Sequence, residues 1–209
     1  MISLPSPIPI DARWLPPGTD PDDLPRIRFT GPERQMLRRK KRIAPSDYAE
    51  KHIVLPPDSP MPGRWRKDAF AYIPGILDAS FFPSVQEILV QAAEQTGKSM
   101  LGDTCIAYAA DRKPGNVLLM MPDEKTAGEY VQDRLQVLFT ASRRLRSYYT
   151  GYVADQSSLR VKLKHMIIYA AWANSAARLA WRSLPYVKID EENKMPATVG
   201  KEGRSPVDL

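Results

Sequence analysis

The sequence contains little cysteine or histidine and has no long hydrophobic run. A single cysteine, Cys105, cannot form an internal disulfide, and two isolated histidines, His52 and His165, are too few for a zinc site of cysteine and histidine ligands. No stretch approaches the roughly 18 apolar residues of a membrane span, and no signal peptide follows Met1. These absences predict a soluble, intracellular protein in which Cys105 is a buried core thiol.

Proline is concentrated in the first part of the chain. Thirteen of the 20 prolines lie in residues 1–62. Because proline lacks a backbone N–H and interrupts both helices and sheets, we expect an extended arm over 1–31. A proline-led helix is expected at 32–42, followed by a short helix at 46–51 that Ser46 caps. The total of 209 residues allows one ordinary domain plus such an arm.

The formal net charge of +6 is unevenly distributed along the chain. Residues 26–42 contain eight lysines and arginines against one glutamate, a local excess of +7, so the other residues sum to about −1. Such a block attracts phosphate backbones or an acidic partner. A solvated helix face explains the same charges equally well. Charge alone therefore leaves DNA binding open.

From Ser84 onward, apolar strand-like runs alternate with amphipathic helical ones. This order is typical of an α/β domain with a mainly parallel sheet flanked by helices. We therefore expect a Pro-rich and basic N-terminal arm over 1–45 and an α/β domain over 46–209. The expected elements are strands at 85–92, 116–121, 159–163, 166–171 and 186–189, and helices at 98–110, 123–140 and 175–180.

A segment at 91–99 has the second half of the phosphate-loop pattern G-x-x-x-x-G-K-[ST]. It follows an expected strand and opens an expected helix, which is where such a loop occurs. Gly97, Lys98 and Ser99 match the pattern, whereas Ala92 stands at the first glycine position. The alternative is an ordinary helix opened by Gly97 with an exposed Lys98, because G-K-[ST] also arises by chance.

In a phosphate loop, each of these residues has a defined role. Unpaired N–H groups at the helix start cradle phosphate oxygens. Lys98 would reach the β- and γ-phosphates, and the Ser99 hydroxyl would ligate Mg²⁺. The residues predicted to bind ATP are Ala92, Ala93, Glu94, Gln95, Thr96, Gly97, Lys98 and Ser99, with Lys98 also catalytic.

A pair of acids, Asp190 and Glu191, follows the last expected strand and lies 92 positions after Lys98. An acid at the carboxyl end of a strand can hold Mg²⁺, and a second can activate the attacking water, so we assign these roles to Asp190 and Glu191 respectively. The alternative is an acidic surface turn, which Lys188 favours because buried parallel strands prefer apolar residues. Together, the loop and the two acids predict a single ligand-binding crevice at the carboxyl ends of the parallel strands.

These motifs resemble the large terminase subunits of tailed phages, specifically the lambda-like group. The resemblance covers roughly residues 45–209. It is found in the approach to the loop (62–65, 72–74 and 76–79), in the loop itself (95–99), in a second strand and helix (117–123 and 134–135), and around the acids (173–179, 185–186 and 190–196).

The resemblance implies a P-loop ATPase that uses ATP and Mg²⁺ to package double-stranded DNA into procapsids. It further implies a small terminase subunit and the portal as partners, a homo-oligomer at full length, no membrane association and a location in the host cytoplasm. The loop has Gln91 and Glu94 where many terminases place a basic residue, so Arg178, Arg182 or a neighbouring subunit would supply that charge. The family continues into further ATPase strands and a nuclease domain, so we expect a truncated ATPase domain that is incomplete at its C-terminus.

Two other functions fit the same residues. The first is a helicase or another nucleic-acid-dependent P-loop ATPase, although a complete helicase needs further motifs. The second is a truncated, non-hydrolysing DNA- or capsid-binding module that uses residues 26–42 and keeps only a vestigial nucleotide site. The aromatic and amide side chains upstream of the loop that could contact adenine are Trp65, Tyr72 and Gln86.

Overall fold

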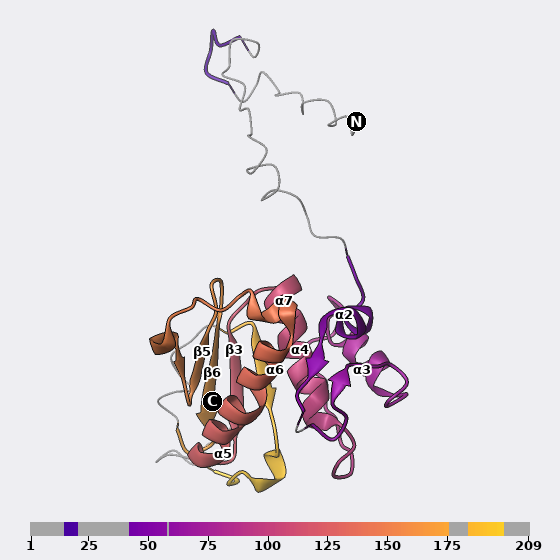
Figure 1. The fold of residues 1–209 in the computed structure, drawn as a ribbon. Coiled ribbons are helices and arrows are strands. Elements are labelled where there is room, and N and C mark those ends of the chain that lie inside the picture. Colours follow the sequence, from indigo (N-terminus) through magenta and orange to yellow (C-terminus); the bar gives the residue numbers. More distant parts are fainter. Residues whose placement is uncertain (1–14, 21–41, 58, 176–183, 199–209) are drawn as a thin grey trace. The chain divides into compact units, whose positions relative to one another are not determined.

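The computed structural model describes residues 15–20, 42–57, 59–175 and 184–198. The chain divides into two units, Met1–Lys41 and Arg42–Leu209, and every helix and strand described below belongs to the second (Figure 1). Most of the expected arm at 1–31 and nearly all of the expected helix at 32–42 lie outside the described residues.

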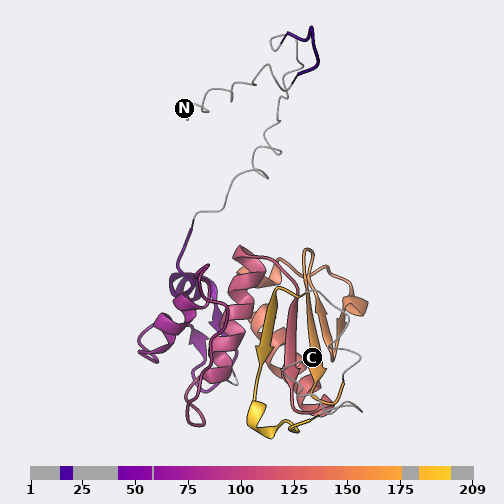
Figure 2. The ribbon, with the colours of Figure 1, turned by 180° about the vertical axis from the view of Figure 1, so that it is seen from behind.

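The second unit contains a five-stranded mixed sheet (Figures 1 and 2). In sheet order its strands are β4 (Gln156–Ser157), β5 (Arg160–Lys162), β6 (Ile167–Trp172), β3 (Val117–Met121) and β7 (Tyr186–Ile189). β3 pairs in parallel with β6 and with β7, whereas β4, β5 and β6 pair antiparallel. The expectation of a mainly parallel sheet is therefore only partly correct. The connections from β4 to β6 are too short for the crossover that parallel pairing needs.

Each face of the sheet has its own apolar cluster, because successive strand residues point to opposite sides. All five residues of β3 are buried, as expected for a central strand with neighbours on both edges. Val117, Leu119 and Met121 belong to the main core together with residues of the surrounding helices. Leu118 and Met120 face the other way and pack with partners that include Leu184 and Met195.

The helices of this unit contribute to the main core. They are α2 (Pro45–His52), α3 (Ile73–Ala79), α4 (Lys98–Arg112), α5 (Glu124–Glu129), the π-helix η3 (Tyr130–Leu135), α6 (Gln136–Ala141) and α7 (Arg143–Arg146). A two-stranded ladder of β1 (Val54–Leu55) and β2 (Gly63–Arg64) lies near α2, and the 3-10 turns are η4 (Val153–Asp155) and η5 (Glu192–Lys194). The expected helices at 46–51 and 98–110 are confirmed, and the one expected at 123–140 contains the π segment. Most of the helix expected at 175–180 lies outside the described residues.

Ser46 does not cap α2, contrary to the prediction. The helix starts one residue earlier, at Pro45, and its N-cap residue is Ala44. The Ser46 backbone N–H and hydroxyl instead donate to the two carboxylate oxygens of Asp78 on α3, at 2.7 and 2.9 Å. The serine therefore joins two helices.

The strand expected at 85–92 is not formed. These residues run without a ladder partner among the described residues, and Leu89 is 79% exposed. An apolar run becomes a strand only where it pairs with a neighbouring strand, and residues 85–92 form no ladder with β7, although β7 is an edge strand of the sheet. The apolar pattern of 85–92 was therefore misleading.

Candidate functional site

The predicted phosphate loop ends in a glycine whose conformation and surroundings exclude a side chain. Gly97 precedes α4 with φ +85°, in the left-handed region that favours glycine. A Cβ at this position would lie 2.9 Å from Ile73 Cδ1 and 3.3 Å from Phe70. Gln95 is also left-handed, with φ +58°. The loop therefore turns sharply into the start of α4, and this turn packs closely against Phe70 and Ile73.

Hydrogen bonds hold the loop in this shape. The Thr96 hydroxyl donates to the Ala93 carbonyl at 2.7 Å, and the Tyr72 hydroxyl donates to the Thr96 carbonyl. Lys98 Nζ donates to the Ala92 carbonyl at 2.7 Å, so the lysine is folded back across its own loop. No described side chain caps α4, and no acid lies in its first turn. The helix start thus suits an anion.

The structure brings Ser99 and the two acids to one cavity of about 260 Å³. Ser99 enters from the first turn of α4, and Asp190 and Glu191 enter from the end of β7. Lys98 and residues 92–97 do not line this cavity, and Lys98 Nζ instead donates to the Ala92 carbonyl. The residues lining the cavity are Ser99, Met121, Thr126, Glu129, Tyr130, Asp133, Arg134, Asp190 and Glu191.

The two acids differ in their surroundings. The Asp190 N–H donates to the Met120 carbonyl at 3.1 Å, which continues the parallel pairing with β3. Asp190 Oδ2 is buried and accepts no hydrogen bond from the described residues. Glu191 has φ +55°, a strained conformation for a residue with a side chain, and its carboxylate accepts from Lys194 Nζ at 2.9 Å. Asp190 is therefore fixed by the sheet, whereas Glu191 lies on a turn at the surface.

Lys188, which argued against a buried strand, is accommodated by a polar cluster beneath the cavity. Its ammonium lies 3.3 Å from Asp103 on α4 and 3.3 Å from Asp190, and it contacts the Tyr130 hydroxyl. Tyr130 donates to Asp103. A Cβ at Gly102 would lie 2.3 Å from Lys188 Cε, so any larger residue there would displace the end of the Lys188 side chain from its present position. We call Asp103, Tyr130, Lys188 and Asp190 the Lys188 cluster.

The family described as "Phage terminase large subunit gpA, ATPase domain" matches residues 59–209, which include the loop, the Lys188 cluster and both acids. The chain belongs to this family. Members of this family act as phage DNA-packaging ATPases. The match agrees with the resemblance found in the sequence. No curated protein and no solved structure is significantly similar to the chain. The described helices are all too short or too polar to serve as a transmembrane span.

An ATPase domain generally uses ATP with Mg²⁺, and the residues of this terminase domain fit the ion. Mg²⁺ prefers oxygen ligands and is usually held by one or two carboxylates with water and substrate phosphates. The Ser99 hydroxyl and the Asp190 carboxylate line the same cavity. Asp190 Oδ2 accepts no hydrogen bond from the described residues, and its contact with them is an ion pair with Lys188 Nζ at 3.3 Å. The described residues contain no cluster of three or more His, Cys, Asp or Glu side chains that could hold a metal alone, so the ion would need the nucleotide as well.

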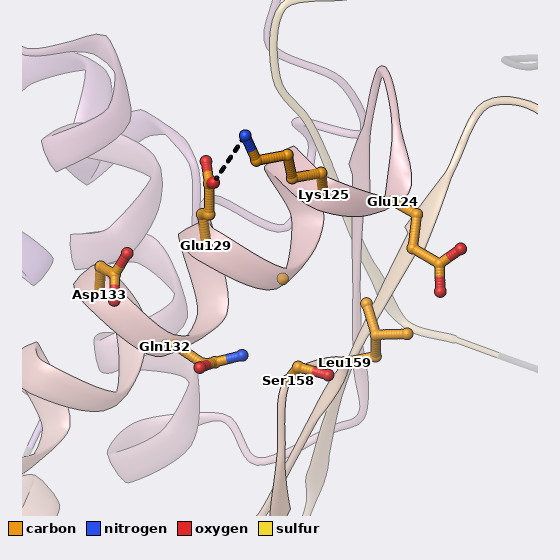
Figure 3. A pocket seen from close by; sticks show the side chains of 8 residues that line it. Glu124, Lys125, Glu129, Gln132, Asp133, Ser158 and Leu159 are labelled. Atoms are coloured by element: carbon orange, nitrogen blue, oxygen red, sulfur yellow. Dashed lines mark ion pairs between the residues drawn. The ribbon is translucent and has the colours of Figure 1, made fainter.

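A second cavity, of about 310 Å³, lies on the other side of Glu129 and Asp133 (Figure 3). It contains none of the predicted site residues. Its charged lining consists of three acids and Lys125, whose ammonium lies 3.6 Å from Glu129. Because no residue of the predicted loop and neither of the two acids lines it, the second cavity is not the predicted nucleotide site. The lining residues are Glu124, Lys125, Gly128, Glu129, Gln132, Asp133, Ser158 and Leu159.

The other predicted residues of the terminase domain have varied surroundings. Trp65 is 1% exposed and therefore cannot contact adenine, whereas Tyr72 lies at the surface beside the loop and Gln86 is exposed. Arg178 and Arg182 lie outside the described residues. Cys105 is only partly buried at the edge of the core, where burial raises the pKa of its thiol to about 11.

Sequence reasoning missed Asp103, Tyr130 and Arg134 as parts of the site. Asp103 follows Ser99 by four positions on α4, a spacing that places both side chains on one helix face. That spacing was the available signal for Asp103. Burial beside Asp103 raises the Tyr130 pKa well above its usual value, so the phenol stays protonated and serves as a donor. Arg134 follows Tyr130 by four positions along the π-helix.

Proposed function

We propose that the chain is the ATPase motor part of a phage terminase large subunit, with a P-loop fold, which hydrolyses ATP to package double-stranded DNA into procapsids. The main support is the convergence of Ser99, Asp190 and Glu191 on one cavity. These three residues come from the start of a helix and the end of a strand that parallels β3. Membership of the terminase family supports the same reaction.

In this proposal the loop binds the phosphates. Backbone N–H groups of residues 92–99 surround the phosphate oxygens at the start of α4. Lys98 exchanges the Ala92 carbonyl for the β- and γ-phosphates, and the exchange replaces a neutral acceptor with a charged one. Ser99 and Asp190 hold Mg²⁺, which would neutralise charge on the phosphate oxygens. The Lys188 ammonium, 3.3 Å from Asp190 Oδ2, would limit the movement of that carboxylate.

Glu191 is the proposed catalytic base. Its carboxylate would leave Lys194, orient a water molecule toward the γ-phosphate and accept a proton from it. The side chain is partly exposed and projects from a turn, so this movement requires no rearrangement of the sheet. Asp190, held by the sheet and by Lys188, is less suited to the role.

The partners follow from this activity and belong to the proposal. Residues 46–209 would form the ATPase domain, and the basic residues in 26–42 would contact the phosphates of double-stranded DNA. The small terminase subunit would select that DNA, and the portal of the procapsid would receive it. The full-length protein would act as a homo-oligomer in the host cytoplasm.

Phosphate release with and without double-stranded DNA tests the proposal. We expect DNA-stimulated hydrolysis by the wild type, and a loss on the order of 10²- to 10⁴-fold in Glu191→Gln, because a general base contributes about that much. Lys98→Ala should also be inactive. Glu192→Gln is the matched control, since Glu192 is an exposed neighbouring acid that does not line the cavity. Equal activity of Glu191→Gln and Glu192→Gln would rule out the assigned base.

A second candidate function is a non-hydrolysing module that binds DNA or the capsid. It is favoured by the missing strand at 85–92, because the loop then lacks the support of a paired strand, and by the contact of Lys98 with Ala92. This alternative predicts DNA binding that weakens steeply with salt, together with no measurable ATP binding. ATP binding that depends on Lys98 would exclude it.

A further inference from the structure

The cavity that contains Ser99 and the two acids has an excess of negative charge. Four of its lining residues are acids, namely Glu129, Asp133, Asp190 and Glu191. Among the described residues that line it, Arg134 is the one cationic side chain. Within the loop at 91–99, Lys98 is the only basic residue. A bound triphosphate would therefore need positive charge from outside the loop.

We propose that Arg134 binds the γ-phosphate of ATP from within the same chain. This inference rests on the proposed function of the site and adds a residue that distinguishes ATP from ADP. Arg134 lines the cavity together with Ser99, Asp190 and Glu191, the residues expected to surround the terminal phosphate. Its planar guanidinium suits a phosphate because it can donate two parallel hydrogen bonds.

Arg134 is weakly held in the structure. Its Nη2 lies 3.6 Å from Asp103 Oδ2, which is longer than a hydrogen bond, and the side chain is 47% exposed. Exposed ion pairs of this kind contribute little to stability. The guanidinium also lies over the Tyr130 ring, with Cζ 5.1 Å from the ring centroid. This stacking holds the guanidinium against the Tyr130 ring but leaves its N–H groups free to choose a hydrogen-bond acceptor.

Asp103 does not depend on Arg134 for its charge balance. The Lys188 ammonium lies 3.3 Å from Asp103 Oδ1, and the Tyr130 hydroxyl donates to the same oxygen. When Arg134 turns toward a phosphate, Asp103 therefore keeps one cation and one hydrogen bond. Lys188 cannot make this movement as easily, because it is 14% exposed and is shared between Asp103 and Asp190. The arrangement leaves Arg134 as the available cation.

The test compares the affinity of the full chain for ATP and for ADP, each with Mg²⁺, by calorimetry. We expect Arg134→Gln to weaken ATP binding on the order of 10- to 100-fold, the range of a lost charged hydrogen bond, while ADP binding stays within about twofold. Arg134→Lys keeps the charge and should recover only part of the ATP affinity. Arg143→Gln, at an exposed position on α7 that does not line the cavity, should change neither affinity.

Each other outcome contradicts the inference in a distinguishable way. Equal losses for ATP and ADP would show that Arg134 acts only through the fold, by its contact with Asp103. An unchanged ATP affinity in Arg134→Gln would show that the side chain does not reach the phosphate. If Arg134→Gln fails to fold, Arg134→Lys is used instead. A loss of ATP affinity without a loss of ADP affinity in that variant would support the inference, and equal affinities to the wild type would contradict it. A wild type that binds neither nucleotide would refute the proposed function, and this inference with it.

Discussion

The Lys188 ammonium lies 3.3 Å from a carboxylate oxygen of Asp190, two residues further along the chain. The same nitrogen lies 3.3 Å from Asp103, so one largely buried cation, with 14% of its side chain exposed, joins α4 to the end of β7. Ser99 lies on α4, and Glu191 lies on the turn that follows β7. The distance between the two halves of the proposed site is therefore set by a polar cluster as well as by the sheet.

Replacement of Lys188 should be costly to stability. Lys188→Met leaves the carboxylates of Asp103 and Asp190 without their shared cation, and removing one partner of a buried ion pair typically costs about 3–5 kcal/mol. Urea denaturation would measure the change in the free energy of unfolding. Asp103→Asn added to Lys188→Met should recover part of the loss, because it removes one unpaired charge.

Lys125→Met is the control for Lys188→Met. Lys125 also pairs with an acid, at 3.6 Å from Glu129, but its side chain is 85% exposed. An exposed pair four positions apart on a helix contributes only about 0.3–0.5 kcal/mol. Similar losses in Lys125→Met and Lys188→Met would show that the cluster beneath the cavity is not a structural element.

The glycine before α4 should be essential for the shape of the loop. Gly97 and Gly151 both have left-handed backbones, with φ +85° and +88°, but only Gly97 is crowded. Alanine in that conformation costs about 1–2 kcal/mol. Gly97→Ala adds a contact with Ile73, and overpacking costs about 1–3 kcal/mol more. Thermal unfolding should therefore show Gly97→Ala to be less stable than Gly151→Ala, and only Gly97→Ala should lose ATP binding.

Stability should fall in alkaline solution because of buried tyrosines. Burial raises the pKa of Tyr148 to about 12, and burial with Asp103 nearby raises the pKa of Tyr130 well above its usual value. Unfolded tyrosine ionises near pH 10, so above that pH the unfolded chain releases protons that the folded chain retains. The stabilising contribution is therefore complete below pH 10 and is lost as pH rises toward 12. Melting temperatures from pH 8 to 11.5 should decline only above about pH 10.

Absorbance at 295 nm gives an independent measure of the same effect. If Tyr130 and Tyr148 titrate as argued, their ionisation should coincide with unfolding. Complete ionisation of all nine tyrosines near pH 10 in a folded protein would contradict this account.

The sequence allowed the prediction of those parts of the fold that depend on local pattern. The apolar run at 116–121 predicted the strand that forms β3, and the G-K-S segment located the start of α4. The acids were found because β7 ends directly before them. Their assigned roles remain predictions, as does the division of the chain after residue 45.

Features that depend on distant partners could not be predicted in this way. Residues 85–92 have a strand-like composition but lack a neighbour, and composition does not report the pairing of a strand. Lys188 suggested an exposed strand because its counter-charge, Asp103, lies 85 positions away in the sequence. The contribution of Arg134 to the cavity depends on the orientation of the π-helix, which apolar periodicity does not reveal.

The most direct test of the nucleotide site is calorimetric titration of the full chain with ATP in the presence of Mg²⁺. Lys98→Ala is compared with Lys113→Ala. The two lysines lie at opposite ends of α4, and each donates to a backbone carbonyl, Lys98 to that of Ala92 and Lys113 to that of Phe81. Our account predicts Mg²⁺-dependent binding by the wild type and by Lys113→Ala, and its loss in Lys98→Ala. A folded wild type that binds no ATP, or a Lys98→Ala protein that binds it as tightly as the wild type, would contradict the account.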